Sequence, residues 1–185
     1  MIGRSLYALV FLLNTLFGLY TAAVMLRFLL QWVRADFYNP LCQAIVKITN
    51  PLLLPLRRVI PGWRGLDFAA VALVMIIQII NVVLVAVITG LPLQPLNVAI
   101  WAVLKLIFVL VNLYFISILV EAVLSWTSPG QRNPLANLLW SLNAPLLRPA
   151  RRLIPPLGGL DFSPLVVLIL LQVINILLPL QWPLR

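Results

Sequence analysis

Long apolar stretches alternate with short polar segments along the whole chain. The apolar stretches cover about residues 5–32, 68–89, 96–126 and 162–178, and only isolated polar side chains interrupt them. Stretches of roughly 17–25 apolar residues have the length that an α-helix needs to cross the hydrocarbon core of a bilayer. The pattern therefore predicts an all-α membrane protein with four transmembrane helices.

The segment between the first two predicted spans has a different pattern. From residue 37 to residue 50, apolar side chains recur at the three- and four-residue spacing of a helix, with polar side chains between them. This spacing predicts an amphipathic helix in the membrane interface. Pro51, Pro55 and Pro61 follow, and they cannot all lie in one straight helix because each lacks a backbone donor. We therefore expect a broken helix, or hinge, before the next span.

This segment occurs a second time. Residues 39–68 return as residues 133–162 at a constant offset of 94, with the prolines, paired arginines and aspartate of the hinge in matching places. We therefore divide the chain into two repeats, 1–92 and 93–185, each with two spans, one amphipathic interfacial helix and one Pro/Arg hinge. Because each repeat crosses the membrane twice, the repeats are expected to be parallel, about a pseudo-two-fold axis along the membrane normal.

Composition and charge support this interpretation and orient the protein. Hydrophobic residues make up 63% of the chain and charged residues only 9%, which is too little polar surface for a water-soluble domain. Most of the cations behind the net charge of +9 flank the two hinges. By the positive-inside rule, we expect the hinges in the cytoplasm and both termini on the other side. Anionic headgroups already account for these cations, so no nucleic-acid partner is predicted.

The chain lacks the side chains of most catalytic sites. It has no histidine, one cysteine (Cys42) and four acidic residues. These counts exclude a Ser-His-Asp triad, a histidine-ligated zinc site and an intramolecular disulfide, and they leave few groups for general acid–base chemistry. We therefore expect a protein that is not an enzyme, with no catalytic residue, no bound metal and no cofactor.

Each hinge carries two adjacent arginines followed by an aspartate. The residues are Arg57, Arg58 and Asp67 in the first repeat, and Arg151, Arg152 and Asp161 in the second. In one interpretation, the arginines bind lipid phosphates and the aspartate caps the following helix, with or without pairing to an arginine. In the other, the hinge is a docking surface for anionic lipid headgroups or for an acidic partner.

Amides recur inside the second span of each repeat. Gln78 and Asn81, and their equivalents Gln172 and Asn175, lie three residues apart on one helix face. Hydrocarbon offers no hydrogen-bond partner. These amides are therefore expected either to bond between helices across the pseudo-two-fold axis or to line a polar constriction for an ion or small solute. Lys105, in the third span, either extends toward the interface or lines the same polar interior.

Two charged residues occupy equivalent positions near the ends of the first and third spans. Arg27 and Glu121 are 94 residues apart and opposite in sign. A pseudo-two-fold arrangement brings equivalent positions together, and an ion pair costs far less in a membrane than two isolated charges. We expect either an ion pair between Arg27 and Glu121 or two side chains that reach the interface separately.

The hinge sequence also resembles a known family. The pattern P-x-x-x-P-x-R-R-x-I-P-x-x-x-G-x-D occurs at residues 51–67 and again at 145–161, and the first copy is preceded by Arg27-Phe-Leu-Leu-Gln-Trp32. Over nearly the whole chain, the sequence resembles the YggT family, also called YlmG, of bacteria and plastids. The resemblance implies a multi-pass protein of the bacterial inner membrane, of the proteobacterial two-repeat type, with no agreed biochemical activity. The periplasmic placement of both termini follows from the charge distribution alone.

The resemblance associates the chain with osmotic-stress tolerance, cell division or organelle organisation, and assembly of photosynthetic cytochrome complexes. It supplies no catalytic residues. The first functional hypothesis is a non-enzymatic membrane scaffold or assembly factor that displays its hinges to lipid and to another membrane protein complex. The alternative is a small ion channel or transporter in osmotic homeostasis. Four spans leave little interior for a pore, so a channel is expected to be a homo-oligomer.

Overall fold

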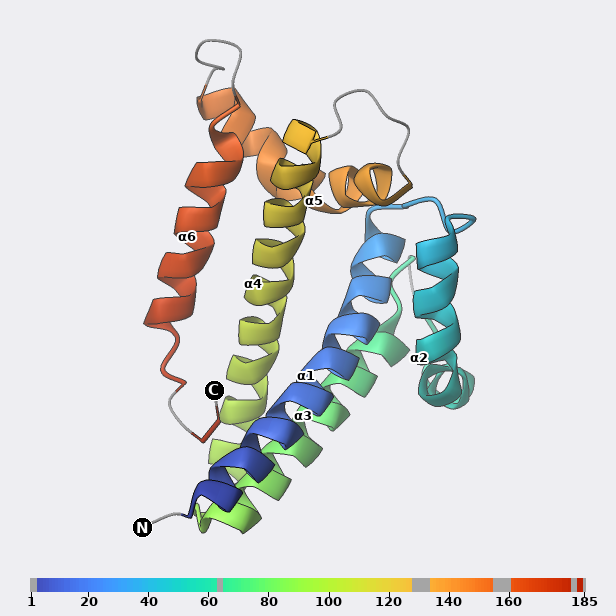
Figure 1. Ribbon diagram of the computed structural model, residues 1–185. Coiled ribbons are helices and arrows are strands. Elements are labelled where there is room, and N and C mark those ends of the chain that lie inside the picture. The colour runs from blue at the N-terminus through green and yellow to red at the C-terminus, as the bar shows by residue number, and fades with distance from the viewer. Residues whose placement is uncertain (1–2, 63–64, 128–133, 155–160, 181–182, 185) are drawn as a thin grey trace.

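The structure is a computed structural model that describes residues 3–62, 65–127, 134–154, 161–180 and 183–184. These residues form six helices (Figure 1). In chain order the helices are α1 (Arg4–Trp32), α2 (Pro40–Val59), α3 (Phe68–Thr89), α4 (Pro95–Thr127), α5 (Pro134–Leu153) and α6 (Ser163–Leu177). Helices α1, α2 and α3 belong to the first predicted repeat, and α4, α5 and α6 are their counterparts in the second.

Three of the helices are long and apolar enough to cross a membrane. They are α1, α3 and α4, with mean hydropathies of 2.0, 3.0 and 2.5 over their best windows. The fourth predicted span is present as α6, an apolar helix of 15 residues. At 1.5 Å per residue, α6 is about 22 Å long, which is shorter than the hydrocarbon core of about 30 Å. The described residues therefore define a helical membrane protein with three helices of full spanning length.

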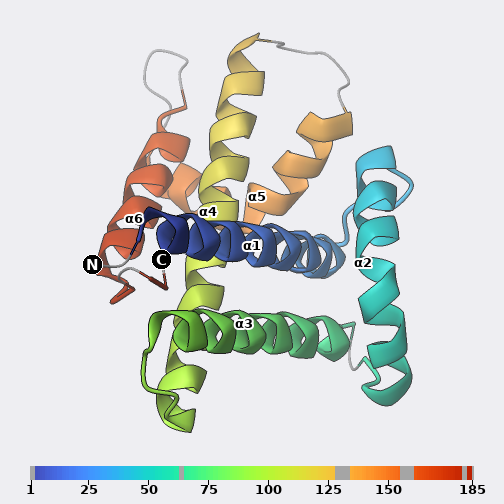
Figure 2. The same cartoon turned by 60° about the horizontal axis from the view of Figure 1, so that its bottom comes forward.

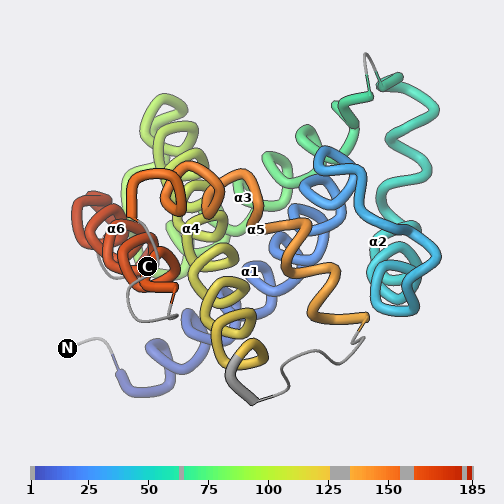
Figure 3. Tube along the Cα trace, turned by 90° about the horizontal axis from the view of Figure 1, so that it is seen from above, coloured from blue at the N-terminus to red at the C-terminus, as the bar shows by residue number. Residues whose placement is uncertain are grey.

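Helices α2 and α5 are the amphipathic elements. Each is continuous over 20 residues and includes two of the hinge prolines, Pro51 and Pro55 in α2 and Pro145 and Pro149 in α5. The helix that we expected to be broken is thus a single one, and α2 bends along its length (Figures 1 and 3). Bending is the usual result of prolines in a helix, because each removes a backbone hydrogen bond and crowds the preceding turn.

The two repeats have the same internal packing. Helix α1 packs along α3, and α4 packs along α6, while α2 and α5 each contact both spans of their own repeat. The contacts between the repeats are not symmetric. Helix α3 packs against α4, but the equivalent contact of α6 with α1 is absent from the described residues. The short turn after α3 explains this difference, since it places α4 directly beside α3 (Figure 2).

Gly90 makes this turn possible. It follows the last residue of α3 with φ 73°, in the left-handed region, and its backbone N–H donates to the carbonyl of Ala86. A side chain in this conformation crowds the following carbonyl, which glycine avoids. Gly90 therefore ends α3 and starts the turn that brings the second repeat against the first.

We predict that Gly90→Ala lowers the free energy of unfolding by about 1 kcal/mol, because alanine must adopt a left-handed backbone. The control is Gly18→Ala, within α1, where no heavy atom lies within 4 Å of the position of a new Cβ. Detergent-titration unfolding of the purified protein measures both. Equal stability of the two variants would contradict this role of Gly90.

Candidate functional site

The first hinge is held by an ion pair. Arg57, in the last turn of α2, donates from Nε to Asp67 Oδ2 at 3.1 Å, and its Nη2 binds the same oxygen. Asp67 is also the N-cap of α3, where its Oδ1 accepts from the backbone N–H of Ala70 at 3.2 Å. The side chain of Asp67 is 4% exposed. One buried carboxylate thus caps one helix and binds the end of another, which fixes the angle between them.

The second hinge repeats this arrangement. Arg151 Nε donates to Asp161 Oδ2 at 2.8 Å, and Asp161 Oδ1 accepts from the backbone N–H of Ser163 at 2.9 Å, at the start of α6. Burial raises the pKa of Asp161, but the hydrogen bonds from Arg151 and Ser163 outweigh it, so the pKa lies below its usual value. The spacing that relates Arg57 to Asp67 therefore produces the same contact in both repeats.

The second arginine of each hinge takes a different position. Arg58 and Arg152 are both exposed. The next residue in each helix is an exposed aliphatic side chain, Val59 at 80% and Leu153 at 82%. Each interfacial helix therefore ends in a tip made of one cation and one apolar group, which we call the hinge tip. Arg57 and Arg151, which bind the aspartates, hold the helices together. The hinge tips face outward.

The predicted ion pair between Arg27 and Glu121 does not form. Arg27 is 5% exposed and donates from Nη1 to Thr49 Oγ1 at 2.7 Å and to Asn50 Oδ1 at 2.8 Å, both in α2. Glu121 accepts instead from Asn143 Nδ2 of α5 at 2.7 Å, and its Oε1 lies 3.7 Å from Arg151. Each charge faces the interfacial helix of its own repeat.

These two contacts are equivalent, with donor and acceptor exchanged. Position 27 corresponds to 121 and position 49 to 143, at the same offset of 94. In the first repeat the span donates, from Arg27 to Thr49. In the second repeat the interfacial helix donates, from Asn143 to Glu121. Both contacts hold the interfacial helix to the end of the first span, so Thr49 and Asn143 belong to the site although sequence reasoning missed them.

The polar residues inside the first repeat bind one another, or Lys105 of the second repeat, between helices. Gln78 Nε2 of α3 donates to Thr21 Oγ1 of α1 at 3.0 Å, within the repeat. Lys105 of α4 is 6% exposed and donates from Nζ to Asn14 Oδ1 of α1 at 2.7 Å and to Asn81 Oδ1 of α3. Lys105 thus lies in the interior and joins α1, α3 and α4, which is the second of its two expected placements.

The amides of the second repeat behave differently. Asn175 of α6 exchanges hydrogen bonds of 3.3 Å with Asn112 of α4, within one repeat. Gln172 is exposed on α6. The bonds of Gln78 and Asn175 therefore run within a repeat instead of across a pseudo-two-fold axis. Among the described residues, Lys105 alone links the repeats through the duplicated amides, because it lies in the second repeat and donates to Asn81 of the first.

No metal centre is apparent in the described part of the chain. No group of three His, Cys, Asp or Glu side chains gathers there. All four acidic residues of the sequence are described, and three of them bind arginine or asparagine in the hinges. Cys42, on α2, is buried and unpaired with another cysteine.

Fold and site together define a small helical membrane protein with two hinge repeats. The chain belongs to the CCB3/YggT family, whose pattern matches it twice, over residues 6–88 and 100–182. This confirms the resemblance found in the sequence and the internal duplication. No solved structure matches the chain.

Several relatives are similar over most of their length. The uncharacterised protein PA0392 of Pseudomonas aeruginosa is 42% identical over 179 residues, which cover 96% of this chain and 90% of the relative. The uncharacterised protein YggT of Escherichia coli strain K12 is 45% identical over 170 residues, 90% of this chain and 87% of the relative. An uncharacterised protein of Vibrio alginolyticus is 41% identical over 91% of both chains. The shared architecture thus comes without an assigned activity.

We predict that double-mutant cycles will show Arg27 to be energetically coupled to Thr49 of α2 and not to Glu121 of α4. Arg27→Met with Thr49→Val should give a coupling of about 1 kcal/mol, because a charged donor loses a buried acceptor. Arg27→Met with Glu121→Gln should give less than about 0.5 kcal/mol, the limit for independent sites. Unfolding in detergent supplies both values. A larger coupling for the second pair would show that the two charges interact after all.

Proposed function

We propose that this protein is a non-enzymatic scaffold or assembly factor of the bacterial inner membrane, which presents two cytoplasmic hinge tips to anionic lipid headgroups and to another membrane protein complex. The family resemblance suggests a role in osmotic-stress tolerance or cell division. The observation that carries the proposal is the duplicated hinge. In both repeats the first arginine is bound by the aspartate, whereas the second arginine and the next aliphatic side chain are exposed.

The proposed topology has four spans in two parallel hairpin repeats. Helix α6 supplies the fourth span, although it is shorter than the others. In Figure 1 the start of α1 lies at the bottom of the bundle, and the end of α1, the start of α2 and helix α5 lie toward the top. Because the cations gather at the hinges, the positive-inside rule places α2 and α5 at the cytoplasmic surface and both termini in the periplasm.

The energetics favour a docking role for the hinge tips. An exposed arginine near an anionic membrane surface contributes about 1 kcal/mol of attraction, and the aliphatic neighbour adds apolar area that a partner covers. Arg57 and Arg151 are already engaged in holding the helices. The spans supply no comparable surface, since their exposed side chains are mostly plain aliphatic ones that suit lipid.

We predict that a photo-crosslinking residue at Val59 or Leu153 captures anionic lipid and one recurrent membrane protein in living cells. Arg58→Gln combined with Arg152→Gln should reduce both products several-fold, because two attractive charges of about 1 kcal/mol each are lost. Lys47→Gln is the control, since it removes an exposed cation of α2 away from the tip. Equal yields in the double variant and the control would exclude docking at the hinge tips.

The alternative function is a homo-oligomeric ion channel or transporter. The observation that favours it is Lys105, a buried cation in a span that no acidic residue neutralises in the described structure. Beside it, Gln78 Oε1 and Asn81 Nδ2 are buried and have no hydrogen-bond partner among the described residues. Intramembrane charges with incomplete partners are typical of conduction or transport sites.

Potassium and sodium flux into liposomes tests this alternative. If the buried polar residues line a pathway, flux should appear with the wild-type protein and disappear when Gln78, Asn81, Gln172 and Asn175 are changed to leucine. If they only join helices, the folded protein should show no flux above that of empty liposomes. The second outcome is the one we expect, because most of these residues are bonded between helices.

A further inference from the structure

An apolar groove lies between the two repeats. Its volume is about 800 Å³. Helices α1 and α4 form its walls, and the apolar faces of α2 and α5 close one end of it. The lining includes Gly18 and Ala22 of α1, Ile116 of α4, Ile45 of α2, and Leu138 and Leu142 of α5. The groove therefore begins at the interfacial helices and continues along the membrane-spanning ones. A lipid acyl chain runs in the same direction, from the membrane surface into the bilayer.

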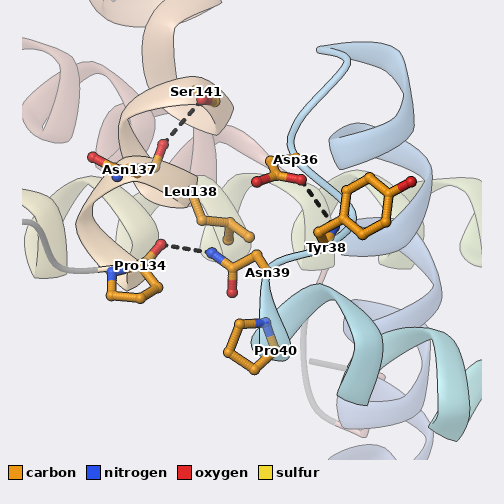
Figure 4. A pocket seen from close by; sticks show the side chains of 8 residues that line it. All are labelled: Asp36, Tyr38, Asn39, Pro40, Pro134, Asn137, Leu138 and Ser141. Carbon is orange, nitrogen blue, oxygen red and sulfur yellow. Dashed lines mark hydrogen bonds between the residues drawn. The ribbon is translucent and has the colours of Figure 1, made fainter.

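A polar pocket of about 410 Å³ adjoins this groove at the membrane surface (Figure 4). It lies where α2 and α5 begin, and Asn39 Nδ2 donates to the carbonyl of Pro134 at 2.8 Å across it. Its other polar side chains are those of Asp36, Tyr38, Asn137 and Ser141. Leu138 lines both the pocket and the groove. The two spaces thus form one site with a polar mouth and an apolar body.

The charge of the mouth differs from that of the hinges. Among the described residues that line the pocket, Asp36 is the only charged one. The hinge arginines lie at the opposite ends of α2 and α5, and a straight helix of 20 residues is about 30 Å long. The mouth therefore favours a cationic group beside Asp36.

We propose that the groove and pocket together hold one phospholipid with a primary-amine headgroup of the ethanolamine class. Its acyl chains lie between α1 and α4, and its ammonium lies beside Asp36. A helix of a second copy fills the apolar body but leaves the polar mouth without a partner. A lipid with a net negative headgroup meets the carboxylate of Asp36 and lacks the ammonium that pairs with it.

Native mass spectrometry in detergent tests the site with an equal mixture of phosphatidylethanolamine and phosphatidylglycerol of identical chains. The wild-type protein should retain one lipid and prefer phosphatidylethanolamine several-fold. Gly18→Leu should reduce retention about tenfold, because its side chain enters the groove where no atom lies within 4 Å of the new Cβ. Ala8→Leu, exposed on α1 outside the groove, is the matched control and should retain lipid like the wild type.

Asp36→Asn tests the mouth separately from the groove. Asp36 Oδ1 accepts from the backbone N–H of Tyr38 at 2.9 Å, and the asparagine oxygen keeps this bond while the charge is lost. The variant should retain one lipid without headgroup preference. Equal retention of both lipids by the wild type would overturn the proposal, as would equal retention by Gly18→Leu and Ala8→Leu. A lipid-free dimer that Gly18→Leu separates would assign the groove to a second copy instead.

Discussion

The absence of hydrogen-bond partners in hydrocarbon is the constraint on which this structure depends. A polar side chain inside a bilayer must find its partner in the protein. Here those partners lie on neighbouring helices. Thr21 and Gln78 join α1 to α3, Asn112 and Asn175 join α4 to α6, and Lys105 joins both repeats. Because hydrocarbon offers these side chains no other partner, the few bonds between helices favour the helix rotations in which they form.

The same constraint acts at the membrane surface through the hinges. An interfacial helix that carries two prolines bends, and nothing within the helix itself fixes its angle to the span that follows it. The carboxylate of Asp67 fixes this angle, because it caps α3 and binds Arg57 at the end of α2. Asp161 links α5 to α6 in a related way, because it binds Arg151 and the backbone N–H of Ser163, the first residue of α6. The span that precedes each hinge is tied in as well, through Arg27 or Glu121. Each interfacial helix is therefore fixed at its middle and at its end.

Much of this architecture follows from the sequence, because periodicity and repetition are local properties. The span predicted over residues 68–89 is α3, and the paired arginines lie in the last turns of α2 and α5 as expected. The partners of the polar residues do not follow, because they depend on how whole helices are rotated. Gln78 and Gln172 occupy equivalent positions, yet one is buried and the other exposed. The difference arises because α4 covers α3, and no third span covers α6 in the same way.

The exchanged donor and acceptor at positions 27 and 121 mean that the two halves of the chain are no longer interchangeable. Arg27, Arg57 and Asp67 together carry one net positive charge, whereas Glu121, Arg151 and Asp161 carry one net negative charge. A chain assembled from two first halves would place an arginine opposite a threonine in both repeats and would lose the negative centre. The two halves therefore present unlike charges at their interfacial helices, although the arginine–aspartate contact of the hinge is the same in both.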